Sequence, residues 1–199
     1  SKVTKVDDAR STLYIAKLEH NGGCNAPPAA LVNLLRAASK ELELNVSDEE
    51  RMLSPDDEAL FRHHLIFMHG RHKFQFSAKE RQQLAEYLAR GGMIMADSIC
   101  ASKSFTTALR RELNEALADR PLQRIPPTHR LFTDACGGAD IREVTLRDPM
   151  MGDGDQPIAA RERQVEAQLE GVKIEERWAV IFSPYDISCA PESHEAVGC

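Results

Sequence analysis

Leu65-Ile66-Phe67-Met68 leads directly into His69-Gly70-Arg71-His72, and Gly91-Gly92-Met93-Ile94-Met95-Ala96 leads into Asp97-Ser98-Ile99-Cys100. These two stretches decide the fold, because short continuous apolar runs are typical of strands that a parallel sheet buries on both faces. In an open α/β sheet, the loops that follow the carboxyl ends of the strands meet at one rim, where ligands bind. We therefore expect one rim to hold the polar side chains of His69, His72, Asp97, Ser98 and Cys100.

Helical and extended segments alternate around these two strands. Strands are predicted at residues 12–18, 44–46 and 141–146, with a strand pair at 172–174 and 178–182 whose second member is central. Helices are predicted at 29–42 and 104–118, and Ser77 with Glu80 forms a capping box that begins another. This alternation implies right-handed crossovers and a parallel sheet. We predict a single α/β domain over residues 1–199, a three-layer sandwich with leading strands in the order 2-1-3-4-5, a flexible arm at 1–11 and a surface loop at 148–160.

Composition narrows the classes of partner. The chain has 199 residues, 42% of them hydrophobic, and a net charge of -6 with scattered Lys and Arg. A nucleic-acid binder needs a basic face, so we expect no nucleic-acid partner. No apolar run approaches the ~20 residues of a membrane span, so we expect no direct membrane insertion of this domain. No dinucleotide or phosphate-loop glycine motif occurs, and we predict no cofactor.

Several motifs together resemble a known bacterial family. They lie at residues 24–28, 67–77, 87–92, 96–102, 126–132 and 183–189, and include Phe67-Met68-His69-Gly70-Arg71-His72 and Ser183-Pro184-Tyr185-Asp186-Ile187-Ser188-Cys189. The chain resembles the family catalogued as domain of unknown function 4159. The resemblance implies a flavodoxin-like sheet related to class I glutamine amidotransferase-like domains, and no established activity. It also implies an exported or membrane-associated full-length protein. Because the chain starts at Ser rather than Met, we expect that a leader, anchor or partner domain has been removed.

Cys100 is the candidate nucleophile, since it lies between a strand and a helix, where the related amidotransferases have theirs. A reactive thiolate needs a base and a helix N-terminus or cation beside it. His69 or His194 is the candidate base, and Asp97 or Glu192 the residue that orients it. Against this hypothesis, a tight nucleophile elbow needs small residues, and no glycine flanks Cys100. The alternative is a semi-buried structural cysteine.

A metal-dependent hydrolase is another alternative. The candidate ligands are His20, His69, His72, Asp97, Cys100 and Cys189, all at expected loop ends. They come from four separate loops, so we assign no metal site. The structural alternative for His69 is a ring bonded to backbone carbonyls, and for His72 it is solvent exposure.

The favoured hypothesis is a non-catalytic rim that binds a ligand. Tyr185 follows the predicted central strand and can stack on a ligand, while Asp186 can accept hydrogen bonds from sugar or peptide groups. The other residues predicted to line this rim are His20, Asn21, Arg71, His72 and Ser98. We expect a ligand- or protein-binding module of an envelope-associated bacterial protein, with a small molecule or a protein as partner and an enzyme as the less favoured interpretation.

Overall fold

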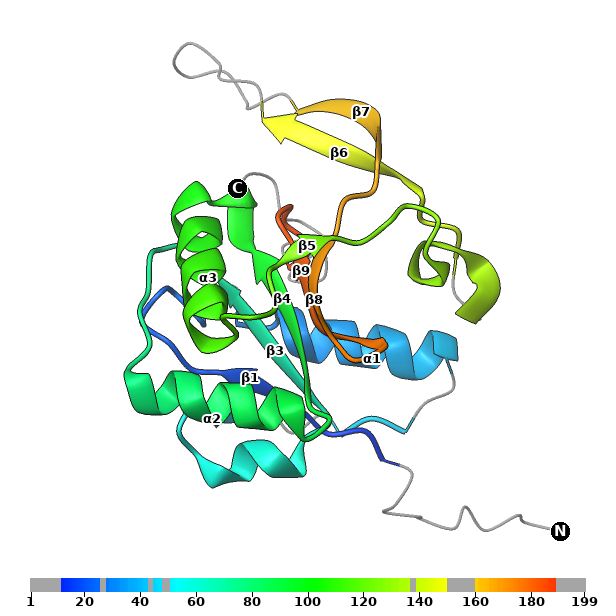
Figure 1. Cartoon of the computed structure of the whole chain (residues 1–199). Coiled ribbons are helices and arrows are strands. Elements are labelled where there is room, and N and C mark those ends of the chain that lie inside the picture. Colours follow the sequence, from blue (N-terminus) through cyan, green and yellow to red (C-terminus); the bar gives the residue numbers. More distant parts are fainter. Residues whose placement is uncertain are drawn as a thin grey trace, which may run out of the picture.

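The computed structural model describes residues 12–25, 28–42, 45–47, 51–136, 139–149 and 160–188. A seven-stranded sheet forms the centre of the fold (Figure 1), in the order β2-β1-β3-β4-β9-β8-β5. Five neighbouring strands are parallel, namely β2 (Met52–Leu53), β1 (Ile15–Leu18), β3 (Leu65–Gly70), β4 (Met93–Ser98) and β9 (Arg177–Ser183). Two antiparallel pairings complete the sheet through β8 (Glu170–Ile174) and β5 (Gln123–Arg124).

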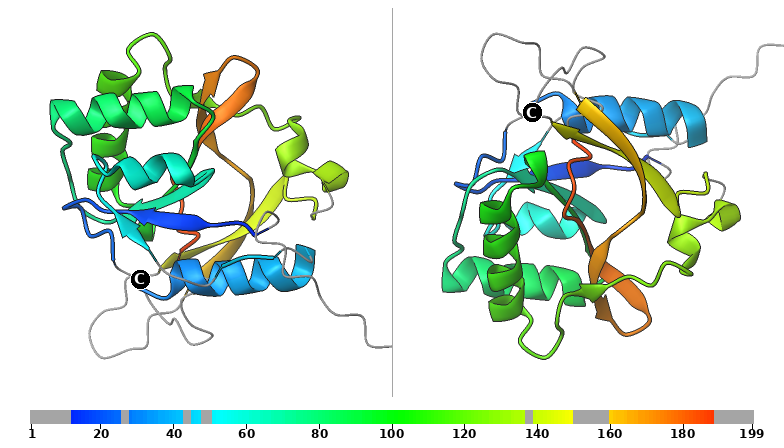
Figure 2. Two further views of the ribbon diagram at one scale, coloured as in Figure 1. Left: turned by 90° about the horizontal axis from the view of Figure 1, so that it is seen from below. Right: turned by 90° about the horizontal axis from the view of Figure 1, so that it is seen from above.

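Three helices cover this sheet. Helix α1 (Ala30–Leu42) lies on one face, and α2 (Ala78–Ala89) and α3 (Lys103–Ala116) lie on the other (Figure 2). The short 3-10 turns are η2 (Glu58–Arg62), η3 (Ile99–Ala101), η4 (Arg130–Phe132) and η5 (Asp134–Cys136). A separate antiparallel pair, β6 (Glu143–Pro149) with β7 (Ala160–Glu166), stands apart from the main sheet (Figure 1). The α/β class and the mainly parallel sheet are as predicted.

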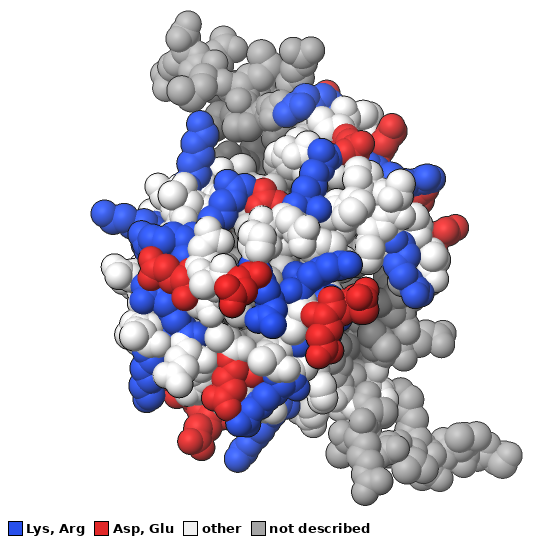
Figure 3. All heavy atoms as spheres, in the orientation of Figure 1, with Lys and Arg blue, Asp and Glu red and all other residues white. Residues whose placement is uncertain are grey.

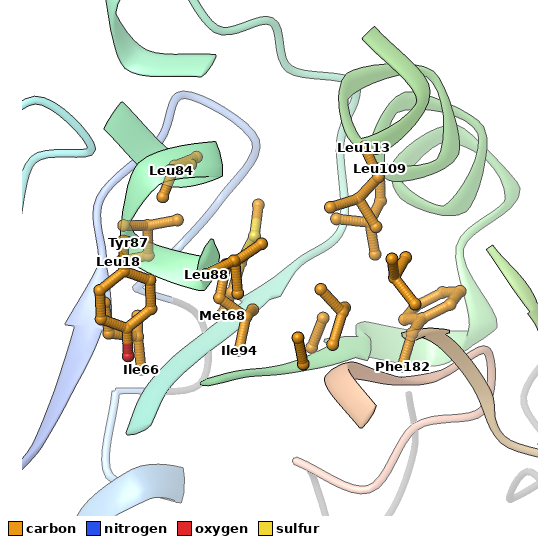
Figure 4. Packing of buried hydrophobic residues seen from close by; sticks show 14 of the residues in the cluster. Leu18, Ile66, Met68, Leu84, Tyr87, Leu88, Ile94, Leu109, Leu113 and Phe182 are labelled. Atoms are coloured by element: carbon orange, nitrogen blue, oxygen red, sulfur yellow. The ribbon is translucent and has the colours of Figure 1, made fainter. Parts of the chain in front are cut away.

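Strand β3 fills both layers of the core because successive side chains point to opposite faces. Ile66 and Met68 join the large cluster beneath α2 and α3 (Figure 4), whereas Phe67 packs with Leu31 and Leu35 of α1. All three strand residues are at most 2% exposed. This two-sided burial explains why the sequence of β3 is continuously apolar rather than alternating.

The predicted capping box at the start of α2 is confirmed. The Ser77 hydroxyl accepts a hydrogen bond from the Glu80 amide, and the Glu80 carboxylate accepts one from the Ser77 amide at 2.6 Å. These two bonds satisfy amides that the first helical turn leaves without partners. The helix ends before Gly91, which has a φ of 106° that a side chain would disfavour.

Some local predictions differ from the structure. The first, third and fourth predicted strands lie side by side as expected, but β9 takes the fifth place, and the predicted strand at 141–146 corresponds to β6 of the separate pair. Of the predicted strand at 44–46, the described part shows a single bridge between Leu13 and Val46, and the edge strand is instead β2. The strands β6 and β7 include Asp148, Pro149 and Ala160 from the predicted surface loop, while the predicted arm at 1–11 and residues 150–159 lie outside the described residues.

The surface mixes both charge signs. Lys and Arg alternate with Asp and Glu over the face shown in Figure 3, without a continuous basic area. Within the described part of the chain, no helix is long and apolar enough to cross a membrane.

Candidate functional site

The register of the sheet brings His69 and Asp97 together at the ends of β3 and β4. His69 pairs with Asp97, and Asp97 pairs with Ser183 on β9. Because the three strands are parallel, their carboxyl ends meet at the same rim, as the sequence predicted. Both side chains are fully buried, however, so they lie beneath the rim rather than on its surface.

Ser188 joins these two buried groups. Asp97 accepts hydrogen bonds from the amides of Ile187 and Ser188, at 3.0 and 2.9 Å, and its Oδ2 also contacts the Ser188 hydroxyl. The same hydroxyl lies 3.1 Å from Nδ1 of His69, whose Nε2 lies 2.9 Å from the carbonyl oxygen of Cys24. The network therefore connects β3 and β4 with the loops that follow β1 and β9.

The order of the three side chains is not that of a hydrolytic triad. In a triad the histidine lies between the acid and the nucleophile, and the nucleophile is accessible. Here Ser188 is the middle member and is only 2% exposed. Ser188 is therefore placed to hold the loop after β9 against the sheet, and not to attack a substrate.

Burial determines the protonation of this network. Burial raises the pKa of Asp97 to about 7, although hydrogen bonds from Ser188 and Ile187 oppose the shift and the nearby Asp186 adds to it. Burial, together with the charge of Lys17, lowers the pKa of His69 to about 4. The ring of His69 is therefore neutral near pH 7. Each of its two nitrogens faces a polar partner, the Ser188 hydroxyl or the Cys24 carbonyl.

Cys100 follows Asp97 by three residues and is partly exposed. It belongs to η3, directly between β4 and α3, and its backbone is left-handed with φ 52° and ψ 32°. Its amide donates to Oδ2 of Asp186 at 2.6 Å, and the guanidinium of Arg71 contacts its sulfur. The thiol is partly exposed, and Arg71 is exposed. The rim thus brings together a cation, a thiol and a carboxylate from three loops.

The described contacts do not pair Cys100 with His69. Both ring nitrogens of His69 face other partners, the Ser188 hydroxyl and the backbone carbonyl of Cys24. A bond to a backbone carbonyl is what we expected if His69 had a structural role. Asp97 likewise contacts Ser188 rather than a histidine. The other candidate base and orienter, His194 and Glu192, lie outside the described residues.

The remaining predicted rim residues divide between interior and surface. The His20 ring lies 4.7 Å from the Phe74 ring, donates from Nε2 to the His69 carbonyl at 2.9 Å and accepts from the Gly22 amide. Burial lowers the pKa of His20 to about 4, so this ring is also neutral near pH 7. His20 therefore supports the loop after β1.

Ser98 is buried, and its hydroxyl donates to the Ser102 carbonyl at 3.1 Å ahead of α3. Tyr185 and Asp186 are half-buried, whereas Asn21 and His72 are exposed. Sequence reasoning missed Ser188 and the fully buried Lys17. The family motif at 183–189 includes Ser188 and was the one feature that pointed to it.

The candidate metal ligands do not gather in the part of the chain that the structure describes. Those residues contain no group of three or more His, Cys, Asp or Glu side chains able to hold an ion. Cys189, one of the candidates, lies outside them. A surface hollow lies elsewhere, between η2 and α2 beside Phe61, Arg62 and Gln83, at the end of the sheet where β3 and β4 begin. It is therefore remote from the rim.

Comparison with known proteins identifies the family but no activity. None of the curated proteins matches the chain. One family, described as a domain of unknown function, matches residues 14–199, which include every described element of the main sheet and the network around Ser188. The chain therefore belongs to the DUF4159 family.

Proposed function

We propose that this chain is a non-catalytic binding module of an envelope-associated bacterial protein, and that its ligand binds at the rim formed by Arg71, Cys100, Tyr185 and Asp186. One observation supports this most: His69, the predicted base, and Asp97, the residue predicted to orient it, are fully buried and bonded to Ser188. The accessible groups of the rim are suited to recognition, since a guanidinium binds carboxylates and an aromatic ring stacks on sugars or peptides.

We further propose a flavodoxin-like relationship to the glutamine amidotransferase-like superfamily. The order of the five parallel strands, β2-β1-β3-β4-β9, supports it, as does the position of Cys100 between β4 and α3. Because one fold accommodates many unrelated chemistries, this relationship carries no activity with it.

The binding proposal is tested by titrating the isotope-labelled protein with short peptides that end in a free carboxylate and with oligosaccharides. Binding is monitored through the NMR chemical shifts of the backbone amides. We expect saturable shifts around residues 71, 100 and 185, and at least tenfold weaker binding in Arg71→Ala and Tyr185→Ala. Arg62→Ala is the matched control, since Arg62 borders the hollow at the other end of the sheet. Shifts scattered over the surface, or equal losses in all three variants, would contradict the proposal.

A cysteine-dependent enzyme is the second candidate, favoured by the left-handed backbone at Cys100. A strained strand-to-helix turn exposes a nucleophile in hydrolases, and a cation beside a thiol is the setting in which protein cysteines react as thiolates. In this alternative Cys100 attacks the substrate, and His69 must exchange its bond to Ser188 or Cys24 before it can serve as the base.

Thiol alkylation separates the two candidates. If the protein is a cysteine-dependent enzyme, iodoacetamide should label Cys100 at least tenfold faster than free cysteine at pH 7. Arg71→Ala should then slow the labelling of Cys100 to the rate of free cysteine. Cys24 is buried, so labelling of Cys24 would reveal that the protein had unfolded during the reaction. Labelling at or below the rate of free cysteine favours the binding module.

A further inference from the structure

The buried network has one hydrogen too few unless it holds an additional proton. The Ser188 hydroxyl has one hydrogen but lies between two groups that are acceptors in their ordinary forms, Oδ2 of Asp97 and Nδ1 of His69. In addition, Nε2 of His69 faces the Cys24 carbonyl, which can only accept. A neutral His69 therefore has its hydrogen on Nε2 and a lone pair on Nδ1.

Only a network with the additional proton satisfies every contact. If Asp97 is protonated, it donates to Ser188, Ser188 donates to His69, and His69 donates to Cys24. If His69 is an imidazolium, it donates to Ser188, which donates to an ionised Asp97. Without the proton, either tautomer of His69 leaves two acceptors facing each other, at 3.1 Å or at 2.9 Å. Such a buried contact costs free energy.

We propose that Asp97, Ser188 and His69 share a single additional proton that rests on Asp97, and that its release turns Asp97 into an anion facing Asp186, weakens the bond between Asp186 and the Cys100 amide, and so makes the rim around Cys100 sensitive to pH. The amides of Ile187 and Ser188 bond an anionic Asp97 more strongly than a neutral one, so they stay in place. The Asp186 carboxylate, which accepts from the Cys100 amide, instead faces a second negative charge when Asp97 ionises. Repulsion between the two carboxylates therefore alters the support of Cys100 directly.

The groups around the network indicate where the proton resides and when it leaves. The ammonium of Lys17 on β1 disfavours a cation on His69, His20 is neutral near pH 7 and adds no charge, and Asp186 faces both Asp97 and His69. Cys24 contributes its carbonyl. The proton therefore belongs to Asp97, and the pKa of about 7 for that carboxyl sets its release close to neutral pH. This proposal is independent of the proposed ligand, because it concerns only contacts within the chain.

NMR titration of the full chain tests it without any variant. We expect the carboxyl carbon of Asp97 and the Nδ1 nitrogen of His69 to change together, with one midpoint within a unit of pH 7. Over the same range the exchange protection of the Cys100 amide, corrected for intrinsic rates, should fall by about tenfold, as the loss of its bond to Asp186 implies, while the Ile187 and Ser188 amides keep their protection. An Asp97 already ionised at pH 5, or a titration of Asp97 to which His69 does not respond, would overturn the proposal.

Two serine variants separate the shared proton from simple burial. Ser188→Ala should uncouple the two groups, so that the Nδ1 signal of His69 no longer changes at the midpoint of Asp97. Ser183→Ala is the matched control: Ser183, at the end of β9, is as buried as Ser188, but its hydroxyl bonds only within its own turn, to Tyr185. The control must keep the coupled titration, and equal behaviour of the two variants refutes the shared proton.

Discussion

At the residue scale, Gly70 shows how little space the rim leaves beneath its surface. A Cβ at this position would lie 2.5 Å from Cε2 of the buried Phe105 ring and 2.8 Å from the carbonyl oxygen of Gly22. Neither neighbour is the end of a flexible side chain, so α3 or the loop after β1 would have to shift. We expect Gly70→Ala to lower the free energy of unfolding by about 3 kcal/mol, measured by urea denaturation.

Gly91→Ala provides the comparison for this prediction. Gly91 has a positive φ of 106°, and nothing lies within 4 Å of the position that a methyl carbon would take there. Its substitution therefore costs backbone strain alone, about 1 to 2 kcal/mol. If Gly70→Ala is no more destabilising than Gly91→Ala, the close approach of Phe105 and Gly22 does not restrict this site.

At the scale of single elements, the start of α2 depends on local chemistry. Ser77 and Glu80 satisfy each other's amides, so Ser77→Ala should destabilise the protein by about 1 kcal/mol. Exchange of the first-turn amides should increase with it. Ser104→Ala is the control, since Ser104 is exposed in the first turn of α3 and is not its cap. Equal effects of the two substitutions would show that the capping box contributes no stability of its own.

This dependence also explains which elements the sequence could predict. The capping box and the strands β3 and β4 are determined by neighbouring residues, and their positions were predicted correctly. The edge strand was not, because β2 is two residues long and exists only through pairing with Lys17 and Leu18 of β1.

The sequence predicted where the candidate site lies, but not what its residues do there. Parallel strands put His69 beside Asp97, and that much follows from the sequence. Whether His69 serves as a base or as a structural group depends on Ser188, 119 residues away, and on the backbone carbonyl of Cys24. No local pattern encodes contacts of that kind, since they form only when the loops after β1 and β9 pack over the sheet.

At the scale of the whole molecule, four buried groups should shape the dependence of stability on pH. His20 and His69 have pKa values lowered from 6.5 to about 4, so the unfolded chain binds more protons at both, and stability rises between pH 4 and 6.5. Asp97 has a pKa raised from 3.8 to about 7, so the folded chain binds more protons there, and stability falls across that range. Burial raises the pKa of Tyr87 from 10.0 to about 12, which lowers stability again above pH 10.

These opposing contributions predict a curve with a shallow maximum. Between pH 4 and 6.5 two histidines outweigh one carboxyl, so the urea midpoint should increase. From pH 6.5 to about 7 only Asp97 still contributes, so the midpoint should decline slightly, stay level to pH 10 and then fall. Asp97→Asn cannot release a proton and should abolish the decline near pH 7 while keeping the rise, despite a lower stability throughout. A wild-type midpoint that keeps increasing beyond pH 7.5 would mean that Asp97 is ionised in the folded protein well below neutral pH.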